Sequence, residues 1–410
     1  MEGGGVLTAK DDQFEASASA LGYLYQFAKA LQLCIDQWVG GLEWSVAVEA
    51  ADDIEKHAGS LTDLLQLKQR AEGTRLTDKA PDLWKTLRIW CEAATSGRID
   101  LAETNLFLMT TAELPPGSVG YHLQPKASGH RDEDKALSLL REARKTSSSE
   151  QLQKAFSAFD RLEADGAVGL SDLLVRIDVI GDAPRIDEVR ETMLDHATLV
   201  VGHDLAKPFL TRLEGWFYDR VIQQMRSPGG APITGEEFDQ VFSDLRHQFG
   251  PNSLPIDPDI ADLDPEPADS ADKMFVRQLD LIGVGSERIR LAVRDYVRAF
   301  NQRSRWSEEK LLRAGELGRY ERRLVEEWQA RFADMREDLG DEATEEEMKR
   351  EAKLIYRWVD REARAQIRSG LEEVFIPKGS YHMLADELRV GWHPEFTARL
   401  MALLEPAGAR

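Results

Sequence analysis

The sequence predicts a mixed α+β domain, with a small mixed sheet flanked by helices, followed by an all-α C-terminal domain. Three observations predict this arrangement. Residues 16–110 read as helix, three strands, helix and strand, and residues 289–332 carry apolar side chains at helical spacing. Residues 251–272 are rich in Asp, Glu and Pro, a composition typical of linkers. We therefore predict domains over residues 1–250 and 273–410, joined by an acidic linker over residues 251–272.

The elements of the N-terminal domain follow from the spacing of apolar residues and from turn residues. Apolar residues at spacings of three and four predict a first helix, which Gly40 and Gly41 end. The alternation of Trp44, Val46 and Val48 then predicts a strand. The expected elements are a helix over residues 16–38, strands over 44–49, 52–56 and 64–68, a helix over 81–95, a strand over 105–110, and mostly helices over 135–249 with one strand considered at 173–180.

The composition narrows the class of protein. No apolar run approaches the roughly 20 residues that span a bilayer. Glycines stand where a signal peptide has its apolar core, so we expect a cytoplasmic protein without a membrane segment. Cys34 and Cys91 lie in apolar, helix-like segments and are expected to be buried thiols. The net charge of −21 argues against simple electrostatic binding to DNA, because its phosphates need Lys and Arg partners.

Asp53, Gln66 and Lys68 are the residues whose pattern is best suited to chemistry. Side chains at i and i+2 of a strand share a face, so Gln66 and Lys68 point the same way. A hairpin turn can bring Asp53 of the preceding strand beside Lys68. Carboxylate and amide oxygens are hard ligands for Mg²⁺ or Mn²⁺, and a lysine can stabilise charge on a phosphate. This combination suits the hydrolysis of a phosphodiester.

The competing interpretation of these residues is an ordinary solvated sheet edge, and spacing alone favours it. Other chemistries have less support in the sequence. His57, His196 and His203 are isolated from one another and from cysteines, which argues against a zinc site. The sequence also lacks the Gly-x-x-x-x-Gly-Lys-Ser/Thr loop, so we do not expect this chain to hydrolyse ATP itself.

Five sequence blocks, taken in order, resemble a known nuclease domain. They are Gly22-Tyr-Leu-Tyr-Gln26, Val48-Glu49, Asp52-Asp53-Ile54, Gln66-Leu-Lys68 and Asp82-Leu-Trp-Lys-Thr-Leu87. Over residues 15–245 the chain resembles the double-stranded DNA endonuclease domain of bacterial anti-phage systems, first associated with CBASS effectors. That domain belongs to the PD-(D/E)xK superfamily. The resemblance implies a restriction-endonuclease-like fold, a Mg²⁺ or Mn²⁺ cofactor and cleavage of double-stranded DNA.

The resemblance also assigns catalytic and metal-binding roles. Lys68 matches the superfamily lysine, and Asp53 matches the metal-binding acid. Asp52 is the alternative acid, because a slip of one residue changes the face of a strand. Gln66 stands where many members have Asp or Glu, which removes a negative charge from the metal site. We therefore expect Asp53, Gln66 and Lys68 to be catalytic, and the metal ligands to come from Asp53, Gln66 and Asp52.

Three further residues are assigned to the surroundings of this site. Glu49 is expected to be either a further metal ligand or one half of a structural ion pair. Gln26 occupies a place on the first helix where relatives often carry Glu, and it either lies near the metal or contacts the backbone of the sheet. Tyr25, beside it in the sequence, is expected to be a supporting or DNA-proximal residue.

In the C-terminal domain, residues 284–324 carry eleven Lys or Arg against six Asp or Glu, the reverse of the balance of the whole chain, and four of these arginines stand out. They are Arg290, Arg294, Arg298 and Arg305, and their spacings place several of them on one helix face. One interpretation is a surface that contacts DNA phosphates or an acidic partner. The alternative is a solvated face with intrahelical ion pairs to Glu287 and Asp295.

A second set of blocks points to partner proteins. It comprises residues 295–306, 320–324, 381–387 and 391–394, together with Trp328. Over residues 275–400 the chain resembles the C-terminal module of ABC-three-component defence effectors, which Lamassu nuclease subunits combine with such a nuclease domain. The resemblance implies an SMC-like ABC ATPase and a small third component as partners. It further implies an anti-phage nuclease effector that the complex holds inactive until release and self-association.

Self-association is expected because two-strand cleavage needs two metal sites, and one chain offers only one. We predict a homo-oligomer, a tetramer or a dimer, joined through the apolar stripe Leu317, Leu324 and Trp328, although that stripe equally closes an internal core. The alternative function is a catalytically inactive, nuclease-like scaffold of the same complex, and Gln66 is the feature that favours it. Cleavage of RNA uses the same chemistry and is not excluded.

Overall fold

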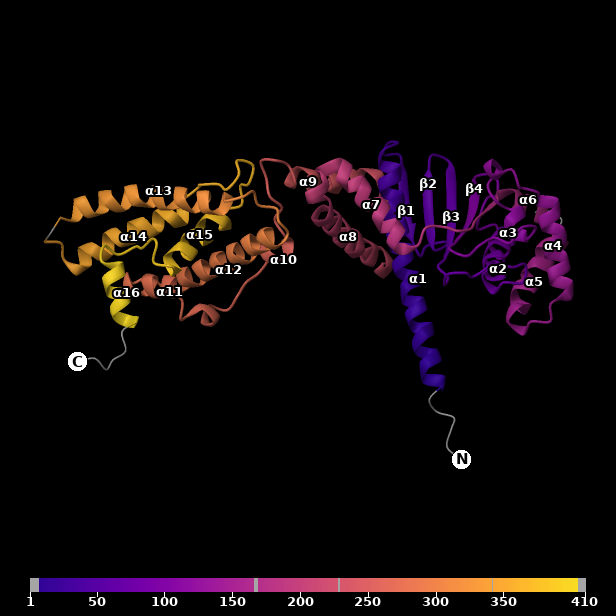
Figure 1. The fold of residues 1–410 in the computed structure, drawn as a ribbon, viewed down its shortest axis with the longest axis horizontal. Coiled ribbons are helices and arrows are strands. Elements are labelled where there is room, and N and C mark those ends of the chain that lie inside the picture. Colours follow the sequence, from indigo (N-terminus) through magenta and orange to yellow (C-terminus); the bar gives the residue numbers. More distant parts are fainter. Residues whose placement is uncertain (1–6, 166–168, 228, 341, 405–410) are drawn as a thin grey trace, which may run out of the picture. The chain divides into compact units, whose positions relative to one another are not determined.

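The computed structural model of the protein describes residues 7–165, 169–227, 229–340 and 342–404 (Figure 1). The chain divides into an N-terminal unit, Met1–Val200 with Phe209–Asp244, and a C-terminal unit, Val201–Pro208 with Leu245–Arg410. Among the described residues, all strands belong to the N-terminal unit. No helix in these ranges combines the length and the apolar character needed to cross a membrane.

The N-terminal unit is built around one mixed sheet of six strands. They are β1 (Trp44–Val48), β2 (Ile54–Ala58), β3 (Leu61–Lys68), β4 (Thr104–Thr110), β5 (Ile177–Ile180) and β6 (Ile233–Thr234). Their order is β5-β4-β3-β2-β1-β6; β3, β4 and β5 run parallel, and the other neighbours are antiparallel. Strand β3 therefore lies inside the sheet, and the interpretation of Gln66 and Lys68 as residues of a solvated sheet edge is wrong.

Helices flank this sheet, as the sequence predicts. They are α1 (Leu7–Trp38), α2 (Pro81–Thr95), α3 (Val119–His122), α4 (Glu133–Thr146), α5 (Gln153–Ala164), α6 (Leu170–Arg176), α7 (Ile186–Val201), α8 (His203–Arg226) and α9 (Gly235–Gln248). Helix α1 contacts β1 and β3, and α2 contacts α5. Cys34 of α1 and Cys91 of α2 are free, buried thiols, which confirms that prediction.

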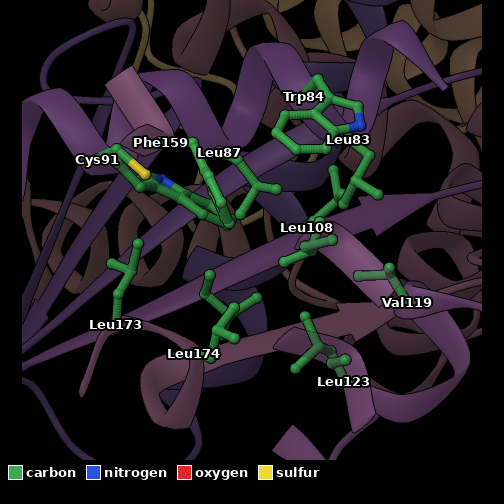
Figure 2. Packing of buried hydrophobic residues seen from close by; sticks show 14 of the residues in the cluster. Leu83, Trp84, Leu87, Cys91, Leu108, Val119, Leu123, Phe159, Leu173 and Leu174 are labelled. Atoms are coloured by element: carbon green, nitrogen blue, oxygen red, sulfur yellow. The ribbon is translucent and has the colours of Figure 1, made fainter. Parts of the chain in front are cut away.

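A large hydrophobic core joins the sheet to α2 and α5. Trp84 of α2 is fully buried, and its ring meets the Phe156 ring of α5 edge-on with 4.7 Å between centroids. Figure 2 shows Trp84 and Leu87 of α2 in the same cluster as Leu108 of β4. Leu64 belongs to this cluster too. Since side chains alternate along a strand, α2 covers the face of β3 that carries residues 64, 66 and 68.

The C-terminal unit is helical in its described part, which agrees with the all-α prediction. From residue 258 its helices are α10 (Pro258–Ala261), α11 (Met274–Leu281), α12 (Ser286–Glu308), α13 (Glu316–Leu339), α14 (Glu345–Arg361), α15 (Phe375–Asp386) and α16 (Phe396–Leu404). Leu324 and Trp328 of α13 are buried inside the unit. The predicted oligomer contact through Leu317, Leu324 and Trp328 is therefore corrected, because two of these side chains already close an internal core.

The segment expected to be an acidic linker, residues 251–272, is folded against α12. The Trp306 indole donates a hydrogen bond to the carbonyl oxygen of Pro255 at 2.7 Å. The Gln302 amide nitrogen donates to Asp257 Oδ2 at 2.8 Å, and Ile260 is buried. This segment therefore has buried side chains and fixed partners within the C-terminal unit, which an extended linker would not have.

Candidate active site

Glu49, Asp53 and Gln66 lie in one row across three neighbouring strands. Val48 pairs with Ile54 in the β1–β2 ladder, and Ile54 pairs with the residue before Gln66 in the β2–β3 ladder. One residue further along, Glu49 N donates to the Asp53 carbonyl oxygen at 3.0 Å. Continuing this register places Asp53 level with Gln66. The hairpin that the sequence predicts therefore places Asp53 beside Gln66, and the β1–β2 ladder brings Glu49 level with Asp53.

Direct contacts join Asp53, Gln66 and Lys68. The Lys68 ammonium donates to Gln66 Oε1 at 2.8 Å and lies 3.3 Å from Asp53 Oδ2. The Gln66 amide nitrogen donates to Asp53 Oδ1 at 3.0 Å, and Leu67 N donates to Asp53 Oδ2 at 2.7 Å. The structure thus brings together the three residues that the sequence predicts to be catalytic.

This cluster is partly shielded from solvent. Gln66 is only 5% exposed, while the side chains of Lys68 and Asp53 are 21% and 13% exposed. Charges in such a setting are screened less than on an open surface, so their contacts are stronger than those of ordinary surface ion pairs. The Lys68 ammonium uses two of its three donors on Gln66 and Asp53, which leaves one for a phosphate or a water.

Glu49 adds a second carboxylate at the end of β1. Its backbone has φ 53°, in the left-handed region that non-glycine residues rarely adopt. Burial raises the pKa of Glu49, and the charge of Asp53 raises it further, while a hydrogen bond from Gln26 and the charge of Lys68 oppose the increase in pKa. A strained residue kept beside charged neighbours indicates a functional site more than a stabilising turn.

The oxygen atoms of the site fit a hard divalent cation. Asp53 and Glu49 offer carboxylates and Gln66 an amide oxygen, and Gln26 Oε1 is buried without a hydrogen-bond partner among the described residues. Mg²⁺ in proteins commonly uses one or two carboxylates, with water and substrate phosphate as further ligands. No group of three or more His, Cys, Asp or Glu side chains in the described ranges could hold a metal ion. A cation here would rest on two carboxylates, amide oxygens and water.

Asp52 lies apart from this row and is tied to α2. It is 7% exposed, and its Oδ2 accepts a hydrogen bond from the Trp90 indole at 2.8 Å. Its Oδ1 accepts from the Gln66 amide nitrogen. Burial raises the pKa of Asp52, and the hydrogen bonds from Trp90 and Gln66 oppose that increase in pKa. Of the two adjacent acids, Asp53 is therefore the one that contacts Lys68 and is placed to bind a cation.

Tyr25 supports the fold and does not face DNA. It is fully buried, and its hydroxyl donates to the carbonyl oxygen of Pro184 at 2.9 Å. Burial, with a smaller contribution from Glu188, raises the pKa of Tyr25 to about 12. The prediction of Tyr25 as a DNA-proximal residue is corrected on this ground, because nucleic acid cannot reach a buried phenol.

Trp90 is a member of the site that sequence reasoning missed. It lies on the same face of α2 as Leu83 and Leu87, so its position looks purely apolar in the sequence. A buried indole N–H nonetheless needs an acceptor. A search for that acceptor among the polar residues at the ends of the neighbouring strands would have pointed to Asp52.

The four arginines of α12 have partners within the C-terminal unit. Arg290 contacts Glu287 and Asp264, Arg294 contacts Asp295, Arg298 donates to the Leu263 carbonyl oxygen, and Arg305 contacts Asp257 and Asp259. Both intrahelical pairs expected in the alternative interpretation are present. Acidic residues of the preceding segment supply the other carboxylates, so the interpretation as a structural charge network is favoured over a DNA-contacting face.

Comparison with known protein families gives one match. Residues 275–400 match the family model described as C-terminal domain 7 of the ABC-three component (ABC-3C) systems. This confirms the resemblance predicted for that region and supports membership of the chain in such a multi-component system. Comparisons with curated proteins and with solved structures gave no match. The matched residues do not include the Asp53 cluster.

Proposed function

We propose that the chain is a Mg²⁺- or Mn²⁺-dependent endonuclease of double-stranded DNA, acting as the effector of an ABC-three-component anti-phage defence complex in the cytoplasm. The observation that carries the proposal is the set of contacts among Asp53, Gln66 and Lys68. An acid, an amide oxygen and a lysine within hydrogen-bonding distance form the minimal apparatus for metal-assisted phosphodiester hydrolysis.

Each side chain has a definable task in this reaction. Asp53, Glu49 and the Gln66 amide oxygen would hold the cation. When bound, Mg²⁺ supplies Lewis acidity that polarises the phosphate and lowers the pKa of a water ligand. Lys68, held by Asp53 and Gln66, directs its remaining donor toward the water or toward the phosphate oxygens on which charge develops.

The net charge of −21 is compatible with a nuclease whose access to DNA is controlled. The match of residues 275–400 supports partners for this chain, which we propose to be an SMC-like ABC ATPase and a small third component. In this proposal the complex holds the nuclease inactive, and release permits self-association. Two chains then supply the two Asp53–Lys68 clusters that two-strand cleavage requires.

The decisive experiment is cleavage of plasmid DNA by the purified chain with Mg²⁺ or Mn²⁺. Lys68→Ala and Asp53→Ala should each lower the rate by about 100-fold or more, because they remove transition-state charge stabilisation and a metal ligand. Lys56→Ala is the matched control: Lys56 lies on β2, is 17% exposed and pairs with Asp63 at 2.7 Å, away from the cluster. Equal rates for Lys68→Ala and Lys56→Ala would contradict the assignment.

One observation favours the second candidate, a catalytically inactive scaffold of the same complex. Gln66 presents its amide nitrogen, not an oxygen, to Asp53, so the metal-facing side of the site is less acidic than in an acid-bearing relative. Calorimetric titration of the metal-free chain with Mn²⁺ separates the two functions. Binding that Asp53→Ala removes supports the nuclease, and absence of binding by the parent chain supports the scaffold. RNA tested beside the plasmid shows which nucleic acid is cut.

A further inference from the structure

Gln66, Asp52 and Trp90 form a buried chain of hydrogen bonds behind the catalytic cluster. We propose that Asp52 and Trp90 are positioning residues that orient the Gln66 amide toward Lys68. This inference deepens the proposed nuclease function and rests on it for its catalytic meaning. The arrangement of the hydrogen bonds supports this positioning role.

Among the described residues, N–H groups donate all the hydrogen bonds that the Asp52 carboxylate accepts. Its Oδ1 accepts from the Gln66 amide nitrogen and from Asp53 N at 3.2 Å, and its Oδ2 accepts from the Trp90 indole at 2.8 Å. Asp52 is 7% exposed and Trp90 is 1% exposed. Asp52 therefore acts as the buried acceptor that fixes the positions of the Gln66 amide and the Trp90 indole.

These partners leave the Gln66 amide one orientation. Its nitrogen donates to Asp52 Oδ1 and to Asp53 Oδ1, and its oxygen accepts from Lys68. A flipped amide would place its oxygen against two carboxylates and its NH₂ group against an ammonium, which the rules of donors and acceptors forbid. Asp52 thereby keeps the Gln66 oxygen beside Lys68, where it can also face a cation.

The same geometry explains why glutamine stands at position 66. A glutamate there would set three carboxylates within hydrogen-bonding distance, with Asp52 buried and unable to move into water. Exchanging the two residues, with asparagine at position 52 and glutamate at position 66, restores one donor–acceptor pair and keeps the total charge. Positions 52 and 66 therefore act as one unit, and the double exchange restores their mutual contact while leaving the glutamate against Asp53 Oδ1.

The first test is a stability cycle on the full-length, metal-free chain. Asp52→Asn and Gln66→Glu should each lower the midpoint of thermal unfolding of the N-terminal unit, because each leaves a buried group facing a like group. The double variant Asp52→Asn/Gln66→Glu should recover at least about 3 °C of the loss seen in Gln66→Glu. Strictly additive losses would overturn the coupling of the two positions, whatever the chain does to DNA.

The second test asks whether the coupling serves metal binding. Trp90→Phe keeps a buried ring but removes the donor to Asp52, and it should weaken Mn²⁺ binding about tenfold in calorimetric titration. Trp84→Phe is the matched control: Trp84 is also fully buried in α2, but its indole donates to the Asp78 carbonyl oxygen at 2.8 Å, not to Asp52. Its Mn²⁺ affinity should equal that of the parent.

The two tests keep the failure of this inference apart from the failure of the proposed function. Equal Mn²⁺ affinities for Trp90→Phe and Trp84→Phe would overturn the positioning role. A parent chain that neither binds Mn²⁺ nor cuts DNA would overturn the nuclease, and with it the catalytic meaning of the network. In that case the stability cycle still decides whether Asp52 and Gln66 form one unit.

Discussion

His382 is expected to make the C-terminal unit sensitive to acid. The imidazole is buried and contacts three aromatic rings, with ring centroids 5.3 Å away at Phe275, 6.3 Å at Tyr356 and 6.2 Å at Trp392. Burial lowers the pKa of His382 from 6.5 to about 3, and the charge of Lys378 lowers this pKa further. Folding therefore requires the neutral imidazole.

The size of the effect follows from proton linkage. Above pH 6.5 the imidazole is neutral in both states, and its contribution to stability is fully present. As the pH falls below 6.5, His382 binds a proton in the unfolded chain but stays neutral in the folded chain. The free energy of unfolding therefore decreases by about 1.4 kcal/mol per pH unit. At pH 5 this loss amounts to about 2 kcal/mol, and it continues until the pH reaches the folded pKa of about 3.

The assay is denaturant unfolding of the parent and of His382→Phe at pH 7.5 and at pH 5. The parent should lose about 2 kcal/mol more than the variant between these conditions, because only the parent carries the titrating group. Phe332→Leu controls for lower stability as such, since Phe332 packs against Trp328 and Phe396 of the same unit and carries no titrating group. An identical loss in parent and His382→Phe would refute the assignment of a buried, neutral imidazole.

Three further predictions follow from the fold and the proposed function. Gly379→Ala should destabilise the C-terminal unit by about 2 kcal/mol in thermal unfolding, because the new methyl group would collide with the Asp295 carbonyl of α12. Gly318→Ala is the control: its methyl group would make only an ordinary contact with Arg322, so it should be neutral or stabilising. Light scattering of the purified chain should show a homo-oligomer; a monomer whose double-strand cleavage is linear in enzyme concentration would contradict this. Co-expression with the SMC-like ATPase should retain residues 245–410, and retention of residues 1–250 instead would place docking on the nuclease.

Much of the fold could be predicted because apolar periodicity reports which face of an element is buried. The helix predicted over residues 81–95 agrees with α2, and the four strands of the first 110 residues are all present. Strands β5 and β6 could not be delimited in this way. The first half of the strand predicted over 173–180 belongs to the end of α6, and only its second half forms β5. Strand β6 is only two residues long. Such short strands are defined by their neighbours in the sheet and not by their own sequence.

In the site, the sequence predicts the cluster of Asp53, Gln66 and Lys68, and the register of the ladders explains why. A turn between β2 and β3 and a spacing of two along β3 suffice to place them on one face. The turn and the strand spacing cannot predict Trp90, because it lies on a helix distant in sequence and contacts Asp52 through tertiary packing. The choice between Asp52 and Asp53 likewise depended on which carboxylate α2 covers.

The distribution of charge links these features to the control of the proposed activity. The charges of two carboxylates, Glu49 and Asp53, act on the single lysine of the site, so the metal-free cluster offers more acidic than basic groups to a phosphate backbone. The α12 arginines are not free to bind phosphates instead, because carboxylates of their own unit already pair with Arg290, Arg294 and Arg305. Under the proposed function, affinity for DNA would come from the bound cation and from the association of several chains. If the proposed function holds, a single chain is expected to be inactive, and assembly is the step at which partners would control the activity.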